Sequence, residues 1–231
     1  MSSCMLFFTV IIAGVFMGTI ATNYCNLKSC VNYGNIHTMC KYTSSTPAST
    51  CSKWEKAGLT DAEKKTIVTL HNQLRRKVAA GKETRGNPGP QPAAATMPDL
   101  TWDNELAMVA QRWANQCKYG HDACRNIERF QVGQNVAIRG STGENLSTVD
   151  QMILSWYSEV DLMNKKYVSS FPKDDTYKKI GHYTQIVYGN TKTIGCGRIF
   201  YKDGKWNQQY LVCNYGPAGN YPNAPVYQIK Q

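Results

Sequence analysis

The side chains in this sequence best suited to acid–base or metal chemistry are its four histidines: His37, His71, His121 and His182. Two of them, His121 and His182, lie in polar segments next to glycine, where loops often present ligands. His71 lies one residue from the apolar stripe of a predicted helix, so we expect it to be packed or capped. Taken singly, each histidine is more often structural than catalytic.

The sequence lacks several motifs of hydrolases and nucleotide-binding proteins. It contains no His-Glu-x-x-His, no Gly-x-Ser-x-Gly and no Gly-x-x-x-x-Gly-Lys. It also has no Cys-x-x-Cys, since Cys25 and Cys30 are five positions apart and Cys117 and Cys124 are seven. Zinc fingers and thioredoxin-type redox sites are therefore disfavoured.

An apolar run at the N-terminus, Met5–Ile20, indicates secretion. It carries no charge, is short for a bilayer span of about 20 residues, and ends at small residues typical of a signal-peptidase site. We predict a signal peptide over residues 1–21 in preference to a membrane anchor. Its removal takes Cys4 away and leaves eight of the nine cysteines, which fits a secreted protein with disulfides. The number of cysteines alone leaves the pairing open.

The chain carries 26 Lys and Arg against 16 Asp and Glu, a formal net charge of +10. Nucleic acid or anionic lipid would suit such a charge. The basic residues are spread along the chain, however, so we expect a solvated basic surface and no nucleic-acid partner. Weak adsorption to acidic glycans or membranes is the alternative. Asn145, in an Asn-Leu-Ser sequon, is a candidate glycosylation site.

Helical periodicity predicts three helices. The first begins at a capping box, Thr60–Glu63, and ends at Gly81. The second is predicted over Trp102–Gln116, and the third begins near Ser147 and includes Val160. The exposed face of the first helix is predicted to be basic, with Lys64, Lys65, Arg75, Arg76 and Lys77. The positions expected to be buried are Ile67, Leu70, Leu74, Val78, Leu106, Val109, Ala110, Trp113, Val149, Ile153, Trp156 and Val160.

A β-hairpin is predicted where the hydrophobic period changes to two. Residues 194–201 and 205–214 flank Asp203-Gly204, a strong turn signal. With the turn centred between these two residues, Cys196 and Cys213 lie within one diagonal step of each other across the hairpin, so we predict a disulfide between them.

Two further segments are predicted to be irregular. Residues 23–58 hold four cysteines without helical or strand periodicity, which indicates a loop-rich, stapled extension. Residues 83–98 contain too much proline and glycine for a helix or a central strand, so we expect a surface loop.

Two segments, Gly181–Tyr188 and Leu211–Asn220, resemble the signature motifs of the CAP superfamily of cysteine-rich secretory, antigen 5 and pathogenesis-related 1 proteins. Five stretches are similar to the antigen 5 venom allergens of stinging Hymenoptera, and most of all to the ant venom allergen 3 group: residues 23–25, 37–42, 83–92, 111–117 and 133–137. The resemblance spans essentially the whole chain after the predicted signal peptide.

This resemblance implies an α+β fold, a three-layer α-β-α sandwich with a central antiparallel sheet and a disulfide-stapled N-terminal extension. The implied layout is a signal peptide at 1–21, a cysteine-rich extension at 22–58 packed on the core, and a CAP domain at 59–231. The antigen 5 pattern also implies four disulfides: Cys25–Cys40, Cys30–Cys124, Cys51–Cys117 and Cys196–Cys213.

Many CAP proteins have a cleft of two histidines and two glutamates that can hold a divalent metal. The matching residues here are His121, Gln134, Glu159 and His182. Gln134 departs from the pattern, because an uncharged amide is a weak zinc ligand. We therefore expect no required cofactor and at most weak zinc binding. Glu144 follows a glycine as the family's glutamate does, but Gln134 occupies the matching position, so Glu144 is interpreted as a decoy.

The resemblance favours a secreted, non-enzymatic venom protein that acts through its surface and meets host antibodies (IgE) as an allergen. One alternative is an extracellular carrier of a sterol, a fatty acid or another small apolar ligand, for which Met108, Met152 and Met163 would supply adaptable surfaces. A second alternative is a metal-assisted hydrolase that uses His121, Glu159 and His182. The sequence leaves the oligomeric state open.

Overall fold

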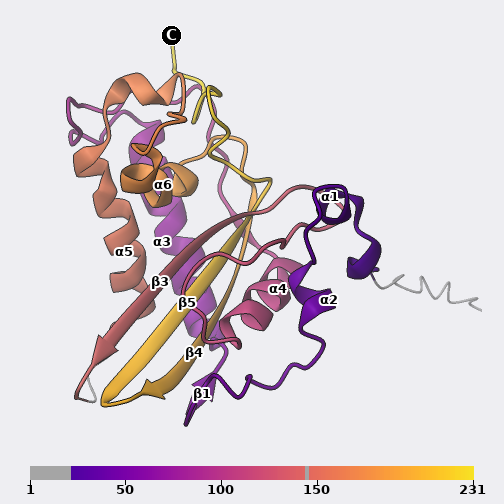
Figure 1. Ribbon diagram of the computed structural model, residues 1–231. Helices are drawn as coiled ribbons and strands as arrows, with labels where there is room; N and C mark the ends of the chain where they lie inside the picture. The colour runs from indigo at the N-terminus through magenta and orange to yellow at the C-terminus, as the bar shows by residue number, and fades with distance from the viewer. Residues whose placement is uncertain (1–21, 144–145) are drawn as a thin grey trace, which may run out of the picture.

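The computed structural model describes residues 22–143 and 146–231 (Figure 1). The predicted signal peptide, the sequon at Asn145 and the decoy Glu144 lie outside the described residues. Within the described part of the chain, no helix is long and apolar enough to cross a membrane.

The central sheet is built on one long hairpin. Strands β4 (Thr193–Asp203) and β5 (Trp206–Gly216) pair antiparallel, and β3 (Gly133–Ser141) pairs with the other edge of β5. The short strand β1 (Lys56–Ala57) lies antiparallel to β4, while β2 (Thr101–Trp102) pairs with β4 in parallel. The sheet order is therefore β1-β4-β5-β3, with β2 off this path.

Helices cover both faces of this sheet. The longer ones are α3 (Asp61–Ala79), α4 (Asn104–Ala114), α5 (Val149–Tyr157) and α6 (Tyr177–Ile186). The short ones are η1 (Tyr24–Asn26), α1 (Lys28–Val31), α2 (Thr38–Lys41), η2 (Ser158–Leu162) and η3 (Lys165–Val168). One apolar core lies between the sheet and α3, α5 and α6, and a second lies between the sheet and α4 (Figure 1). The predicted three-layer sandwich with an antiparallel sheet is confirmed.

Helix α3 begins where the capping box predicted. The Thr60 hydroxyl accepts a hydrogen bond from the Glu63 amide at 3.2 Å, and the Glu63 carboxylate accepts one from the Thr60 amide at 2.8 Å. The predicted exposure of Arg75 is wrong, because its side chain is fully buried. Its guanidinium donates to four backbone carbonyls, those of Pro98, Ile186, Tyr188 and Thr191. These acceptors come from distant segments, so the local pattern could not reveal them.

The other two predicted helices form with shifted ends. Helix α4 starts after Asp103, whose carboxylate caps two amides, so Trp102 lies in β2 and not in the helix. Helix α5 ends at Tyr157, and the buried Val160 belongs to the 3₁₀ turn η2. Leu70 is only partly buried, whereas all the other positions predicted to be buried on the three helices are buried.

The hairpin forms, but its turn is displaced by one residue from the prediction. Asp203 pairs with Trp206, so the turn consists of Gly204 and Lys205. Gly204 has a φ of +58°, a conformation that glycine adopts without the strain a side chain would bring. As a consequence, Cys196 and Cys213 lie directly opposite each other and form a disulfide.

The N-terminal extension lies along α4 (Figure 1). Besides loops, it contains short helices and strand β1. One disulfide, Cys25–Cys40, is internal to it, while Cys30–Cys124 and Cys51–Cys117 join it to the segment after α4. The structure thus joins the same four cysteine pairs that the resemblance implies. The two outer bridges close loops of 94 and 66 residues, which restricts the unfolded chain strongly.

Candidate functional site

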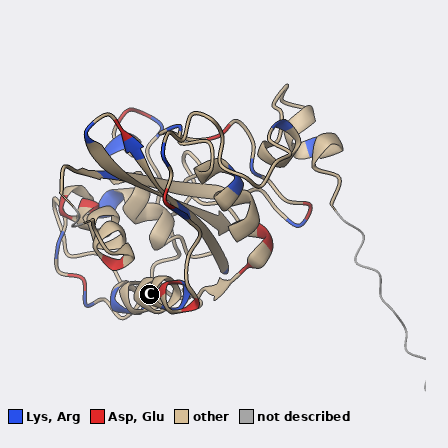
Figure 2. Ribbon diagram, turned by 90° about the horizontal axis from the view of Figure 1, so that it is seen from below, with Lys and Arg blue, Asp and Glu red and all other residues tan. Residues whose placement is uncertain are grey.

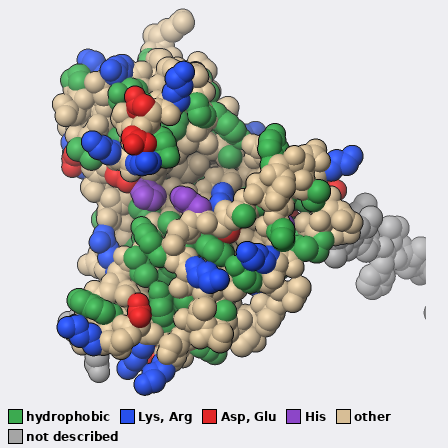
Figure 3. All heavy atoms as spheres, viewed as in Figure 1, with side chains coloured by type: hydrophobic (Ala, Val, Ile, Leu, Met, Phe, Trp, Pro, Cys, Tyr) green, Lys and Arg blue, Asp and Glu red, His purple; other side chains and the backbone are tan. Residues whose placement is uncertain are grey.

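The four residues proposed from the sequence meet at one end of the sheet. His121 lies in the loop after α4, Gln134 is on β3, Glu159 is in η2 and His182 is on α6. A cleft of about 340 Å³ opens between these elements. Its lining residues are His121, Gln134, Asn135, Tyr177, Lys178, Gly181, His182 and Asn220. Figure 3 shows histidine side chains side by side where this face is hollowed.

On one side of the cleft, Gln134 holds His121. The Gln134 amide nitrogen donates to the side-chain oxygens of Asp122 and Asn214, each at 3.0 Å. Its oxygen therefore faces His121 and accepts from Nδ1–H at 2.8 Å, which leaves Nε2 of the neutral ring without a proton. Desolvation by the surrounding protein lowers the pKa of His121, and the charge of Arg125 acts in the same direction.

On the other side, Glu159 holds His182. One carboxylate oxygen lies 2.6 Å from His182 Nδ1, and the other accepts the amides of His182 and Tyr183 at 2.8 and 3.1 Å. Because a carboxylate only accepts hydrogen bonds, Nδ1 of His182 is the donor in this pair, and in the neutral ring Nε2 has no proton. Trp156 stacks on the imidazole, with ring centroids 5.9 Å apart. Glu159 is thus behind His182, and it does not line the cleft.

A buried line of hydrogen bonds supports the cleft from below. Asn135 donates to the carbonyl of His182 at 3.1 Å and to the Tyr215 hydroxyl at 3.3 Å. That hydroxyl pairs with His71 Nε2 at 2.9 Å, and His71 Nδ1 donates to the carbonyl of Ile67 at 2.8 Å. Sequence reasoning missed Asn135 and Tyr215 as site residues, although both lie in segments that carried the family resemblance.

The donor set around the cleft fits a metal ion poorly. The Gln134 oxygen is used by His121, and both Glu159 oxygens are used by α6. Among residues 22–143 and 146–231, no group of three or more His, Cys, Asp and Glu is arranged to hold a metal. Two Nε2 atoms are left, whereas catalytic zinc sites usually have three protein ligands. Any metal here would depend on two imidazoles and water.

The sequence matches the family model described as the cysteine-rich secretory protein family, CAP, over residues 68–215. The chain belongs to the CAP family. It is 59% identical over 215 residues to venom allergen 3 of Solenopsis invicta, covering 92% of each chain. It is 57% identical over 196 residues to venom allergen 5 of Brachyponera chinensis, covering 84% of this chain and 98% of that one.

Solved CAP-like structures agree with the fold. BmVAL-1 superposes with a TM-score of 0.67 at 32% identity, covering 75% of this chain and 85% of that chain. NaASP2 with Zn²⁺ superposes with a TM-score of 0.62 at 26% identity, covering 75% and 89%. The zinc belongs to that structure. In this CAP protein, Gln134 replaces one of the two glutamates in the ligand set that the resemblance implied.

The cleft of this CAP protein can support acid–base chemistry but offers no hydroxyl or thiol nucleophile from serine, threonine or cysteine. None of its lining residues is of these types. The oriented pair of Glu159 and His182 leaves a basic ring nitrogen, as in a general base.

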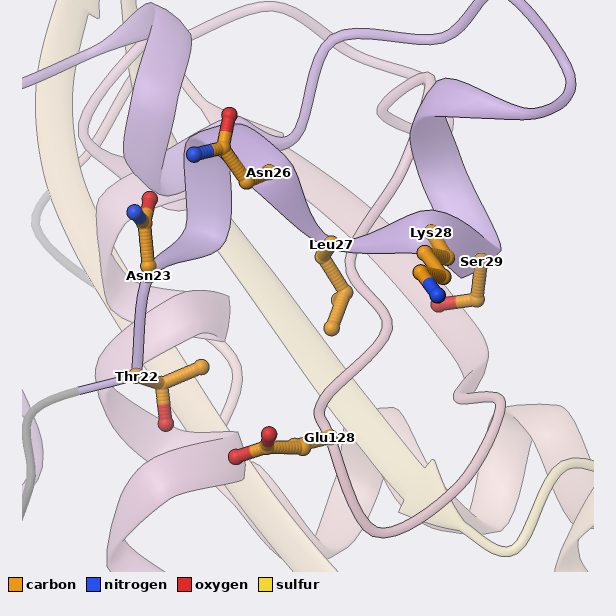
Figure 4. A pocket seen from close by; sticks show the side chains of 7 residues that line it. All are labelled: Thr22, Asn23, Asn26, Leu27, Lys28, Ser29 and Glu128. Atoms are coloured by element: carbon orange, nitrogen blue, oxygen red, sulfur yellow. The ribbon is translucent and has the colours of Figure 1, made fainter.

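Other hollows lie outside the cleft, and two of them bear on ligand binding. Figure 4 shows one of about 460 Å³, lined by Thr22, Asn23, Asn26, Leu27, Lys28, Ser29 and Glu128. Its two charged residues, Lys28 and Glu128, are exposed and of opposite sign, so it favours no particular ligand charge. A groove of about 540 Å³ between α3 and the start of α5 is lined by Ala62, Lys65, Thr66, Thr69, Leu70, Gln73 and Asp150.

Proposed function

We propose that this protein is a secreted, extracellular venom component of the antigen 5 type that performs no catalysis and acts through its surface. Host IgE is its proposed partner in sensitised animals. The observation that carries this proposal is the identity of 57–59% to venom allergens over most of the chain. No cofactor is required for such a role.

The proposal includes the layout of the mature molecule. Residues 1–21 are removed on secretion, residues 22–58 form the stapled extension, and residues 59–231 form the CAP domain. Disulfides tie the extension to the segment after α4, which supports a single rigid surface for antibodies. Lys and Arg are spread over the molecule together with Asp and Glu (Figure 2), as expected for a solvated surface.

The test is antibody binding by the oxidised protein comprising residues 22–231. Sera from hosts sensitised to hymenopteran venom should bind it, and venom should compete for that binding. The matched control is the same protein after reduction and alkylation, which should lose the antibodies that require the folded surface. Binding no greater than with non-allergic sera would contradict the proposal.

The carrier of small apolar ligands is the alternative, and the groove between α3 and α5 favours it. The methionines support it less, because Met152 and Met163 are fully buried in the core and only Met108 is exposed, at 44%. Mass spectrometry of lipid that co-purifies with the protein distinguishes the two. Recovery of a stoichiometric sterol or fatty acid would favour the carrier, and none after loading would exclude it.

The metal-assisted hydrolase is the second alternative, and the oriented pair of Glu159 and His182 favours it. A panel of ester, peptide and phospholipid substrates tests it, with zinc added and removed. Hydrolysis that disappears in His182→Ala would overturn the non-enzymatic proposal. If neither zinc titration nor the panel gives a signal, the hydrolase is excluded.

A further inference from the structure

Two tryptophans of this chain are half exposed, and both lie at one end of its sheet. Trp54 is 45% exposed and Trp206 is 42% exposed, whereas Trp113 and Trp156 are buried at 8% and 3%. A large aromatic ring left in water forgoes the free energy of burial, so exposed rings of this size often mark a binding surface.

Strand pairing brings the two tryptophans to the same end of the sheet, on either side of β4. Trp206 opens β5 beside the hairpin turn, opposite Asp203. Trp54 precedes β1, and two hydrogen bonds fix its neighbours against β4: Lys202 donates to the Ser52 carbonyl at 3.1 Å, and Glu55 donates to that of Phe200 at 2.9 Å. Figure 1 shows β1 beside the end of β4 and the start of β5.

Lysines lie close in sequence to both tryptophans, and one of them contacts the Trp206 ring. The set that we name the tryptophan–lysine end consists of Lys53, Trp54, Lys56, Lys202, Lys205 and Trp206, all of them exposed. The Lys205 ammonium lies 5.8 Å from the centre of the Trp206 ring. Two acidic residues are interspersed: Glu55, whose carboxylate is 3.7 Å from Lys202, and Asp203. Lysines therefore outnumber acidic residues two to one at this end.

We propose that the tryptophan–lysine end docks on the surface of a membrane that contains anionic lipid. Tryptophan rings prefer the interface between headgroups and acyl chains, because one edge is polar and the rest apolar. Lysine stems can lie along that interface while their ammonium groups reach anionic headgroups. The hairpin turn would meet the membrane end-on. This proposal goes beyond allergenicity and holds whether or not IgE binds.

The tryptophans decide between a lipid surface and an acidic glycan. A sulfated polysaccharide would pair with the lysines through charge but has no apolar layer into which the two rings could move out of water. A membrane uses both kinds of side chain at once. The surface is also separate from the cleft and from the groove between α3 and α5, because none of its six residues lines either one.

The experiment is vesicle flotation with the oxidised protein comprising residues 22–231. Vesicles of phosphatidylcholine alone are compared with vesicles that also contain phosphatidylserine, at low and at high salt. We expect binding to the anionic vesicles, weakened by salt, with tryptophan emission shifted to the blue and quenched by brominated lipid. Equal partitioning to both vesicle types, or emission unchanged on binding, would overturn the proposal.

Matched variants locate the surface. Lys202→Glu with Lys205→Glu should lower the partition coefficient at least about tenfold, and Trp54→Ser with Trp206→Ser should abolish the blue shift. The control pair, Lys82→Glu with Lys230→Glu, makes the same charge change on exposed residues and should bind like wild type. Lys82 follows the C-terminal end of α3, and Lys230 is next to the C-terminus, which Figure 1 marks at the end of the molecule opposite β1. An equal loss in the control pair, or full competition by heparin with no emission change, would overturn the proposal.

Discussion

Two sets of polar side chains, one buried on α3 and one lining the cleft, differ in what their polar atoms touch. On α3, His71 has both ring nitrogens paired, and Arg75 donates to four carbonyls. In the cleft, His121 and His182 each have Nδ1 paired and Nε2 left for a ligand. A histidine whose two ring nitrogens are both hydrogen-bonded contributes to stability. A histidine whose Nε2 has no partner can still bind a ligand or accept a proton.

The largest predicted effect concerns Arg75. In Arg75→Met, the carbonyls of four distant segments would lose their donor inside the core, so the free energy of unfolding should fall by about 4 kcal/mol. Denaturant unfolding measures it. The neighbouring Arg76 is the control, since it pairs with Asp99 on the surface and Arg76→Met should cost far less. If the two variants unfolded alike, the role assigned to the buried guanidinium would be wrong.

The second prediction concerns the pH dependence caused by His71. Burial lowers the pKa of His71 from 6.5 to about 4, and the charge of Arg75 acts in the same direction. The unfolded chain therefore takes up a proton near pH 6.5 that the folded protein refuses until about pH 4. Stability should fall by about 3 kcal/mol as the pH drops through this window.

NMR titration and pH-dependent unfolding check this prediction. In His71→Gln the loss between pH 6.5 and 4 should be absent, although the variant will be less stable at neutral pH. The companion variant His182→Gln, in the open cleft, should keep the loss. Titration of His71 near its unfolded value would refute the structural account of its burial.

The third prediction concerns Glu83, whose side chain is fully buried. Burial alone would raise its pKa, but hydrogen bonds from Arg85, Lys77 and Tyr157 hold that pKa far below 4.5. A carboxyl with a lowered pKa stabilises the fold above its unfolded value, and this contribution is lost as the pH falls below about 4.5. Glu83→Gln should lower the free energy of unfolding by about 2 kcal/mol at neutral pH and should reduce the further loss of stability at acid pH. Urea unfolding between pH 7 and 2 measures both effects. The same loss of stability at acid pH in the variant as in wild type would contradict the prediction.

How far the sequence could predict this fold depended on local periodicity. Helices α3, α4 and α5 and the hairpin carry clear apolar periods, and all were predicted to within a few residues. Strand β3 was not, because helices or loops cover both of its faces near the cleft and its buried residues do not alternate. Helix α6 is polar and contains Gly181, and Glu159 stabilises it from outside by accepting two of its amides.

The candidate site, too, could be predicted only as far as local sequence patterns reach. The four proposed residues were grouped into one site by resemblance alone, since they are far apart in sequence and only tertiary structure brings them together. Buried Arg75 was misplaced on the surface because its acceptors are backbone carbonyls, which have no sequence signature. Asn135 and Tyr215 were missed because their role is to support the cleft from below, through hydrogen bonds that no spacing encodes.

The smallest predicted effect gives the sharpest test of the difference between His71 and the two cleft histidines. The substitution that produces it changes Gln134, the one cleft residue that departs from the family pattern. Gln134→Glu would place a carboxylate against Nδ1–H of His121, which should raise the pKa of that ring and make Nε2 a better ligand. Zinc affinity should rise about tenfold.

The same change carries a structural cost. A carboxylate cannot donate to Asp122 and Asn214 as the amide of Gln134 does, and it adds a second negative charge beside Asp122. Stability should therefore fall by about 1 kcal/mol. Calorimetric zinc titration of wild type, Gln134→Glu and Glu159→Gln measures the balance, with NMR following His121. If His121 became more basic while zinc bound no tighter, the second imidazole would not reach the same ion. The two halves of the cleft would then be separate hydrogen-bonded pairs, structurally closer to His71 than to a metal site.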